Sequence, residues 1–363
     1  MLSLLLFLVA VRLIAFCTAH PAGHDEISRF QASGVKEITK NTHHKLSRCS
    51  SHLKKRGIQA RTELRRAALL KAYRQGHLGA STAISAVGHS DANPFFLSST
   101  LEDRSCVLTP ETTIGPFRVR GESIRSNITD GEAGVPLILD GLFIDVNTCE
   151  PIEDLYWEMW SCNSVGQYSG VLEHHGSPLS NLNTTFLRGL QKTDKDESAQ
   201  FETIFPGHYE GRATHIHVLA HVGATVLPNN TLTGGHVPHI SQLFFEQELI
   251  TAVEASEPYR TNKAHITLNS DDGIFSSATA DGKYDPVLSY TMLGDKLSDE
   301  ILASVTMGID VSASYRTPYA AELTDHGGVS HRNSWHHSPQ KALRMRCLQL
   351  QKSQYASEVR QVS

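Results

Sequence analysis

The sequence predicts a mainly β protein, in which an antiparallel β-sandwich follows an N-terminal helical segment. From about residue 105 to 315, short apolar stretches alternate with Gly, Pro, Asn and Asp, and no helical pattern separates them. Strands at this density favour an antiparallel sandwich over parallel βαβ units. The stretches expected to form strands are 137–146, 155–160, 215–222, 240–246, 287–293 and 302–311.

Two regions precede the predicted sandwich. Residues 1–19 form an apolar run that ends in small residues, and this run resembles a cleaved signal peptide. It predicts a secreted, extracellular protein; a buried N-terminal helix is the alternative. Residues 20–104 are expected to form a helical segment and a linker, with two helices separated near Gly57 and a linker that starts at Gly76.

The sandwich itself is predicted over residues 105–320, and a different composition follows it. Residues 321–363 are rich in His and Ser, then in basic residues and Gln, and they have few apolar residues at helical or strand spacing. We expect them to form a disordered tail. His336 and His337 lie in this tail, where adjacent histidines on a polar segment are more often inert than metal ligands.

Composition excludes two classes of partner. The formal net charge is −5, so the composition has no excess of basic residues that could bind a phosphate backbone. A nucleic-acid-binding function is therefore not expected. After residue 19, no apolar run is long enough to cross a membrane. Three Asn-x-Ser/Thr sequons, at Asn127, Asn183 and Asn229, fit a secreted glycoprotein.

Cleavage of the signal peptide would leave an odd number of cysteines in an oxidising compartment. They are Cys49, Cys106, Cys149, Cys162 and Cys347. We expect Cys149 to bridge to Cys162 on a neighbouring strand and Cys49 to bridge to Cys106, which leaves Cys347 free. Four cysteines allow three connectivities, and the sequence does not choose among them.

The segment 205–218, FPGHYEGRATHIHV, contains the residues with the clearest chemistry. Side chains alternate along a strand, so His215 and His217 would point to one face and could present two imidazoles to one ion. An isolated His-x-His pair is as often two polar residues on a solvated face as a ligand pair. Tyr209 and Arg212 lie just upstream, which favours the metal site.

A second segment, NSVGQYSG, places Tyr168 in a Gly-containing turn just after a predicted strand. A phenol loses its proton near pH 10, so a zinc-type ion holds it poorly. A trivalent ion is acidic enough to bind it as phenolate. Two tyrosines and two histidines therefore favour iron(III).

Five spaced elements together resemble the intradiol ring-cleavage dioxygenases, which cleave catechols between the two hydroxyl-bearing carbons. They are TIGPF at 113–117, GVPLILDGLFID, WSCNSVGQYSG, GHYEGRATHIH and SQLFF at 241–245. The resemblance covers about residues 105–310. Phe117 stands where the family usually has Tyr, and Ala213 where it often has Pro.

This resemblance implies a non-haem Fe(III) enzyme that acts on a small aromatic diol and O2 and gives cis,cis-muconate-type products. It implies that catechol displaces Tyr209 from the metal. The implied metal ligands are Tyr168, Tyr209, His215 and His217. The implied catalytic residues are Arg212 and Gln242, and the implied substrate-binding residues are Ile114, Pro116 and Arg212. The helical segment before residue 80 would either form a homodimer interface or cover the sandwich.

Other functions fit parts of the sequence. Cleavage after Ala19 would leave His20 at the N-terminus, where its amino group and imidazole could chelate copper. A cupin-like barrel also carries His-x-His, but it normally has a glutamate a few residues later, where this chain has 221–224, HVGA. A secreted β-sandwich binding module with a fortuitous His-x-His would be colourless and iron-free.

Overall fold

The computed structural model describes the chain in six stretches, which are Cys49, 51–78, 112–172, 178–194, 198–280 and 285–331. All of them lie in one compact unit, Val35–Ser334. The predicted signal peptide, His20, Cys106, Cys347 and the pair His336 and His337 lie outside the described residues. Within the described stretches, no helix is both long enough and apolar enough to cross a membrane.

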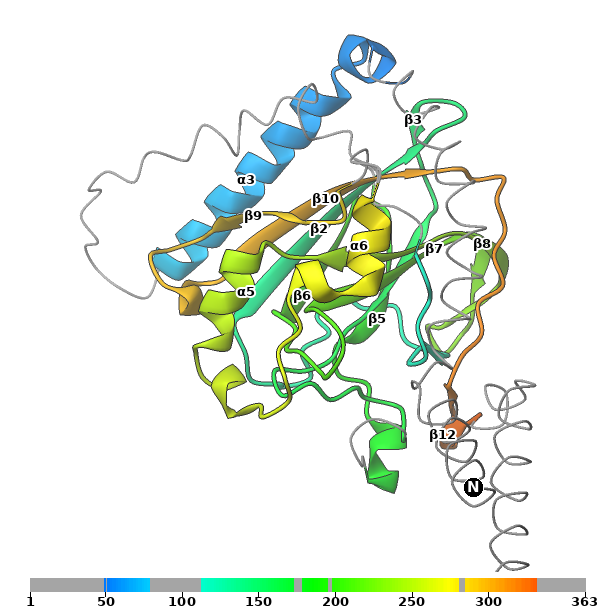
Figure 1. The fold of residues 1–363 in the computed structure, drawn as a ribbon. Coiled ribbons are helices and arrows are strands. Elements are labelled where there is room, and N and C mark those ends of the chain that lie inside the picture. The colour runs from blue at the N-terminus through cyan, green and yellow to red at the C-terminus, as the bar shows by residue number, and fades with distance from the viewer. Residues whose placement is uncertain are drawn as a thin grey trace, which may run out of the picture. The chain divides into compact units, whose positions relative to one another are not determined.

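The predicted fold class is confirmed, because the protein is mainly β with a few helices (Figure 1). The strands are β1 (Val119–Arg120), β2 (Pro136–Asp145), β3 (Glu150–Pro151), β4 (Tyr156–Trp160), β5 (Arg188–Lys192), β6 (Ser198–Ile204), β7 (His215–Val226), β8 (Leu232–Phe244), β9 (Ser289–Met292), β10 (Ile301–Ile309), β11 (Ala321–Thr324) and β12 (Gly327–Ser330). The helices are α3 (Ile58–Leu78), α5 (Gln247–Glu254) and α6 (Gly273–Thr279), with 3-10 turns η1 (Leu179–Asn183), η2 (Tyr259–Thr261), η3 (Asn269–Asp271) and η4 (Leu297–Asp299). All six predicted stretches contain a strand, whereas β5 and β6 were not predicted.

Two sheets form the sandwich. One is antiparallel throughout, in the order β5-β4-β7-β8, and the other has the order β3-β2-β10-β9, with β6 also paired to β2. The prediction of antiparallel pairing fails at β2 and β10, which run parallel from Ile301 opposite Leu137 to Ile309 opposite Asp145. Parallel strands are tolerated where both faces are covered, and the side chains of β2 after Pro136 are buried.

The core lies between these two sheets. From the second sheet it receives apolar side chains such as Leu139, Phe143 and Met307, and from the first sheet side chains such as Trp157 and Val218. Trp157 packs edge-on against Phe143, with ring centroids 5.3 Å apart. Alternate side chains on each strand therefore point into the core, and the side chains between them point to the outer faces of the two sheets.

The N-terminal helical segment covers the outer face of the β2 sheet. Residues 51–55 are helical, and α3 follows after Gly57, as predicted. Asp140 of β2 is fully buried and accepts hydrogen bonds from Arg65 at 2.5 Å and 2.9 Å and from Arg66 at 2.8 Å. The linker expected at Gly76 begins later, because α3 continues to Leu78.

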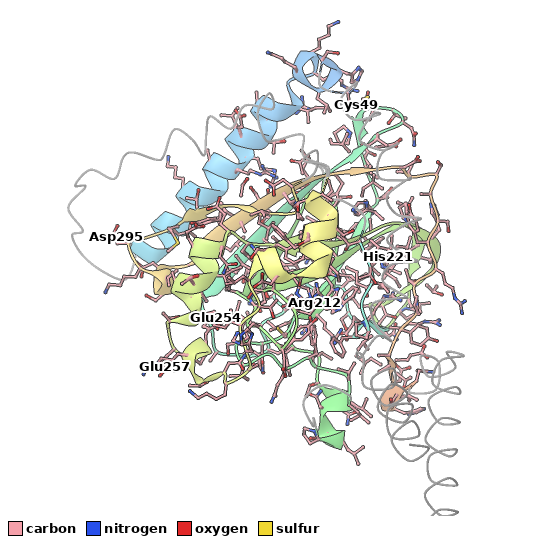
Figure 2. The ribbon with its side chains drawn as sticks, viewed as in Figure 1. Cys49, Arg212, His221, Glu254, Glu257 and Asp295 are labelled. Atoms are coloured by element: carbon pink, nitrogen blue, oxygen red, sulfur yellow. A yellow bond between two sulfur atoms is a disulfide. The ribbon has the colours of Figure 1, made fainter. Side chains whose placement is uncertain are left out.

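The cysteine pairing differs from the prediction. Cys49 is bonded to Cys149, which joins the helical segment to the β2–β3 turn, near the labelled Cys49 in Figure 2. Cys162 is a buried free thiol. Its Sγ donates to the carbonyl of Gly207 at 3.3 Å, and burial raises its pKa to about 12. Cys149 lies in the turn between β2 and β3, whereas Cys162 follows β4 of the other sheet, so the two cysteines are not on neighbouring strands.

Ordered structure extends past residue 320, where the tail was expected to begin. β11 pairs in parallel with β1, and it forms a hairpin with β12. Ala321 is buried, and the backbone nitrogen of Gly328 donates to the side chain of Asn183 at 2.9 Å. These contacts fix residues 321–330 against the sandwich domain, although their composition is polar.

Candidate metal centre and active site

His215 and His217 lie at the start of β7 and point away from the sandwich core. Their neighbours Ile216 and Val218 belong to the core, so alternation puts both imidazoles on the outer face of the sheet. Trp160 of β4 and Gln242 of β8 are the cross-strand partners of His217. The outer face therefore carries a row of Trp160, His217 and Gln242 across three strands.

Three donor groups converge at the end of this row. The Nε2 atoms of His215 and His217 are 3.1 Å apart, and the Tyr209 hydroxyl is 3.3 Å from Nε2 of His215. Two donors that share one ion with bonds of about 2.0–2.2 Å lie at such separations. All three side chains are buried.

The imidazole rings of His215 and His217 are oriented by different contacts. Nδ1 of His215 lies 2.6 Å from the carbonyl of Ala213, so this nitrogen carries the proton and Nε2 keeps a lone pair. His217 stacks on Trp160 with ring centroids 4.9 Å apart and planes 3° from parallel. The Cε1 edge of its ring meets Gly115, where a Cβ would come within 2.6 Å of that atom. Burial lowers the pKa of both histidines well below the usual value, so both are neutral.

Tyr209 and Arg212 are the two ends of one tight turn. The backbone nitrogen of Arg212 donates to the carbonyl of Tyr209, and Gly211 adopts a φ of +82°, which favours glycine. The turn brings the Arg212 Nη1 within 3.5 Å of the Tyr209 hydroxyl and 3.4 Å of Nε2 of His215. A permanent positive charge therefore lies beside the converging donors.

The Arg212 guanidinium is held by two further residues. Its Nε donates to Asp272 at 2.8 Å, and its Nη2 donates to Oε1 of Gln242 at 2.6 Å. Asp272 is fully buried and caps α6 by accepting from the backbone nitrogens of Ile274 and Phe275. Figure 2 shows Arg212 close to this helix. The side chain has little freedom left to turn away from Tyr209.

Tyr168 follows β4 and is fully buried. Its ring lies 5.7 Å from the Tyr209 ring and 6.2 Å from the His217 ring, measured between centroids. Phe117 packs on it at 4.7 Å. Burial is the main reason that the pKa of Tyr168 lies well above its usual value, and burial raises the pKa of Tyr209 to about 12. Neither phenol would ionise here without a strong cation.

Among the described residues, no group of three His, Cys, Asp or Glu side chains could hold a metal ion. A metal centre at this place would therefore depend on the tyrosines. The donor set of two neutral imidazoles and two buried phenols, which a strong cation would convert to phenolates, fits a trivalent ion and does not suit zinc.

Comparison with known proteins supports the predicted resemblance. A family model described as "Dioxygenase" matches residues 118–253, the span that contains all four predicted metal ligands. Over these residues the chain is similar to the dioxygenase family, in agreement with the resemblance to the intradiol ring-cleavage dioxygenases that the sequence predicted.

Several solved structures are similar to this chain. An intradiol ring-cleavage dioxygenase from Tetranychus urticae is 28% identical over 58% of this chain and 98% of its own, with a TM-score of 0.49. A hydroxyquinol 1,2-dioxygenase from Pseudomonas putida DLL-E4 is 18% identical over 57% of this chain and 68% of its own, with a TM-score of 0.37. A catechol 1,2-dioxygenase from Acinetobacter sp. ADP1 is 20% identical over 59% of this chain and 68% of its own, with a TM-score of 0.39. No curated protein sequence matches the chain.

The segment before β1 lies against the candidate site. Nε2 of Gln242 donates to the carbonyl of Thr113 at 2.9 Å, which ties this segment to β8. Ile114 is buried and Pro116 is half-buried. Their neighbours Gly115 and Phe117 contact His217 and the tyrosines. Substrate contact by Ile114 and Pro116 stays a prediction.

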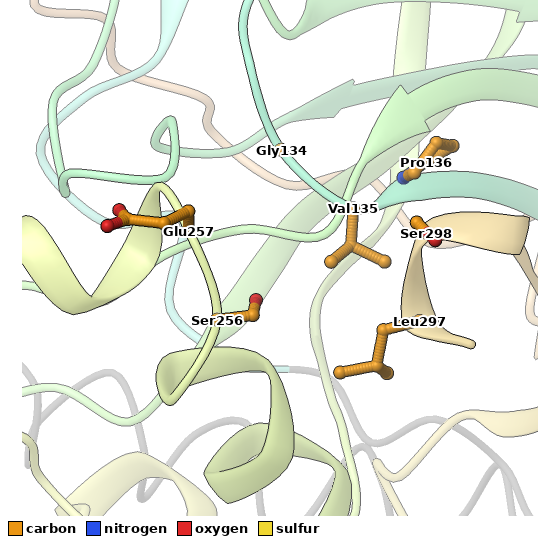
Figure 3. A pocket seen from close by; sticks show the side chains of 7 residues that line it. All are labelled: Gly134, Val135, Pro136, Ser256, Glu257, Leu297 and Ser298. Atoms are coloured by element: carbon orange, nitrogen blue, oxygen red, sulfur yellow. The ribbon is translucent and has the colours of Figure 1, made fainter.

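A separate pocket of about 250 Å³ lies at the start of β2, away from the predicted site residues (Figure 3). Its lining residues are Gly134, Val135, Pro136, Ser256, Glu257, Leu297 and Ser298. None of them belongs to the dioxygenase site that the sequence predicted.

Sequence reasoning missed Asp272, Trp160 as a partner of His217, and Arg188. Asp272 carried a usable signal, because an Asp before a Gly and an apolar residue is a common helix N-cap. Its contact with Arg212 spans 60 residues of sequence. That contact could not be read from the local pattern.

Proposed function

We propose that this protein is a secreted, non-haem Fe(III) enzyme that cleaves catechol-type rings between the two hydroxylated carbons with O2, giving cis,cis-muconate-type products. The observation that carries the proposal is the convergence of two neutral imidazoles and the Tyr209 hydroxyl beside Tyr168, with a guanidinium at 3.4–3.5 Å. When bound, iron(III) would supply the Lewis acidity that holds the phenolates and a catechol dianion.

Tyr168, Tyr209, His215 and His217 would hold the iron. Tyr209 also has a second role, because it is the donor that lies next to Arg212. Its oxygen would be placed to take up a proton from a catechol hydroxyl, and the high pKa that burial gives Tyr209 favours its protonated state. The protonated hydroxyl stays within 3.5 Å of the Arg212 Nη1.

Arg212 would stabilise negative charge that develops on the substrate ring. Asp272 and Gln242 fix its guanidinium before substrate arrives, so little reorganisation is needed during the reaction. Trp160 and Gly115 hold the plane of His217, and Phe117 covers Tyr168 and Tyr209. These apolar contacts exclude water from the donor atoms.

The first experiment is an absorption spectrum of purified iron-loaded protein, before and after addition of catechol without oxygen. We expect a visible phenolate-to-iron band that moves to longer wavelength with catechol, and product formation once oxygen is admitted. His217→Ala should lose the band and the iron. The matched control is His221→Ala, because His221 lies on the same face of β7 and binds Glu158 at 2.6 Å instead. A colourless iron-treated wild type would refute the proposal and favour a binding module.

Secretion is the second part of the proposal. Besides the apolar run at residues 1–19, all three sequon asparagines are exposed on the domain surface. Expression in a eukaryotic secretory host should give protein in the medium whose gel mobility changes after glycosidase treatment. Replacement of Asn127, Asn183 and Asn229 by Gln should abolish this change. Retention of the full-length chain inside the cell would contradict the proposal.

A further inference from the structure

Arg188 is a buried cation that the proposed mechanism does not use. It is 1% exposed and starts β5, directly opposite Trp160 on β4. Its guanidinium donates to the carbonyl of Ser169 at 2.7 Å and 3.1 Å and to the hydroxyl of Ser169 at 2.9 Å. Its Cζ lies 5.9 Å from the centre of the Tyr168 ring, which is within cation–π range.

The charge of Arg188 is weakly balanced by carboxylates. Among the described residues, Glu122 is the carboxylate within ion-pair range, and the closest approach is 3.9 Å. Neither oxygen of Glu122 has a hydrogen-bond partner in the described structure. The neutral oxygens of Ser169 orient the guanidinium without neutralising it. A buried cation normally requires an anion nearby, because burial disfavours an isolated charge.

A guanidinium lies beside each tyrosine of the proposed site, and Arg212 acts on both phenols. Arg212 lies at the hydroxyl of Tyr209, where the substrate would bind, and it is 17% exposed. Arg188 lies over the ring of Tyr168 and is sealed from solvent. The phenolate form of Tyr168 would provide a second counter-charge for Arg188, besides the distant carboxylate of Glu122.

We propose that Arg188 stabilises the phenolate form of Tyr168 and thereby sets the energy at which this phenolate donates charge to the metal. The proposal rests on the proposed iron site. Arg188 is a positioning residue that acts through Tyr168. Glu122 acts against it, because an ionised carboxylate beside the guanidinium weakens the field that Tyr168 experiences.

The direction of the expected shift of the visible band follows from the energy of the phenolate donor orbital. A nearby cation lowers the energy of the phenolate electrons, so charge transfer to iron requires more energy. Arg188→Gln should therefore move the visible band of the iron-loaded enzyme to longer wavelength. Glu122→Gln should move it to shorter wavelength at about pH 8.5, which is above the pKa of about 7 that burial gives Glu122. Arg188→Lys, which keeps the charge, should give the smaller shift of the two Arg188 variants.

A double variant separates electrostatic tuning from a loosened site. In a Tyr168→Phe background only Tyr209 can contribute a phenolate band, so Arg188→Gln should no longer shift the spectrum. The matched control is Arg65→Gln, because Arg65 is a largely buried guanidinium bound to Asp140 on the other sheet, and its loss should leave the band in place.

Three outcomes are distinguishable. Opposite shifts for Arg188→Gln and Glu122→Gln, with no shift in the Tyr168→Phe background, support the proposal. Shifts in the same direction, a persisting shift in that background, or an unmoved band in a coloured Arg188→Gln enzyme would overturn it. A colourless wild type would instead overturn the iron site itself. If Arg188→Gln does not fold, the Glu122→Gln and Arg188→Lys spectra decide.

Discussion

Replacing Glu122 by Gln should make the protein more stable, and the gain should depend on pH. Glu122 is 4% exposed, and burial raises the pKa of its carboxyl to about 7. Four charged groups act on this carboxyl: Arg188 and Arg125 lower the pKa, and Glu158 and Asp130 raise it. Burial outweighs the two arginines.

The magnitude follows from the change in pKa between the unfolded and folded chain. A rise from 4.5 to about 7, at about 1.4 kcal/mol per unit, corresponds to about 3 kcal/mol. Because the folded value is the higher one, the folded state binds more protons between these two pH values. The free energy of unfolding therefore falls as pH rises through this window, and the full penalty is present above about pH 7. Gln cannot ionise and escapes this penalty.

Urea unfolding of iron-free protein at a series of pH values would measure this effect. We expect wild type and Glu122→Gln to be similar near pH 4.5, with the variant about 3 kcal/mol more stable near pH 8. Asp140→Asn is a control of opposite sign, because Arg65 and Arg66 lower the pKa of Asp140 despite its burial. The advantage of Asp140 over Asn should be lost as pH falls. A stability difference between wild type and Glu122→Gln that does not change with pH would refute the reasoning.

Three further predictions concern the site and its support. Asp272→Asn should lower kcat by about 10- to 100-fold and leave the iron band in place, because Asp272 holds Arg212 and does not bind the metal; unchanged oxygen uptake would contradict this. Cys49→Ser should lower the free energy of unfolding by about 2–5 kcal/mol in urea, and reductant should destabilise the wild type but not the variant, since Cys149 then has no partner. Asp140→Ala should cost about 3–5 kcal/mol, because it leaves the Arg65 and Arg66 guanidinium groups without their buried carboxylate. A double variant that also removes Arg65 should recover part of that loss, and a purely additive result would show that the pair is not coupled.

Local sequence patterns predicted those features that depend on strand alternation. The spacing of His215 and His217 placed both imidazoles on one face, and the structure has them on the face away from the core. Tyr168 was identified through resemblance and not through periodicity. Its place beside Tyr209 depends on how β4 and the following turn pack against β7.

Features that depend on distant contacts were not predicted. The bond between Cys49 and Cys149 spans 100 residues, and nothing in the sequence near either cysteine distinguishes it from other pairings. The order of residues 321–330 comes from pairing with β1, although the composition of this segment is that of a tail. In both cases tertiary contacts outweigh local composition.

The parallel pairing of β2 with β10 has a consequence for how the site can form. The two strands at the centre of one sheet are separated by more than 150 residues, and that interval contains Tyr168, Tyr209, His215, His217 and Asp272. A chain extended only to residue 300 would hold every proposed donor but would lack a central strand of the sandwich. Closing so long a loop is entropically unfavourable and slow. During synthesis, therefore, the sandwich that holds the proposed metal ligands can be completed only after β10 has been made.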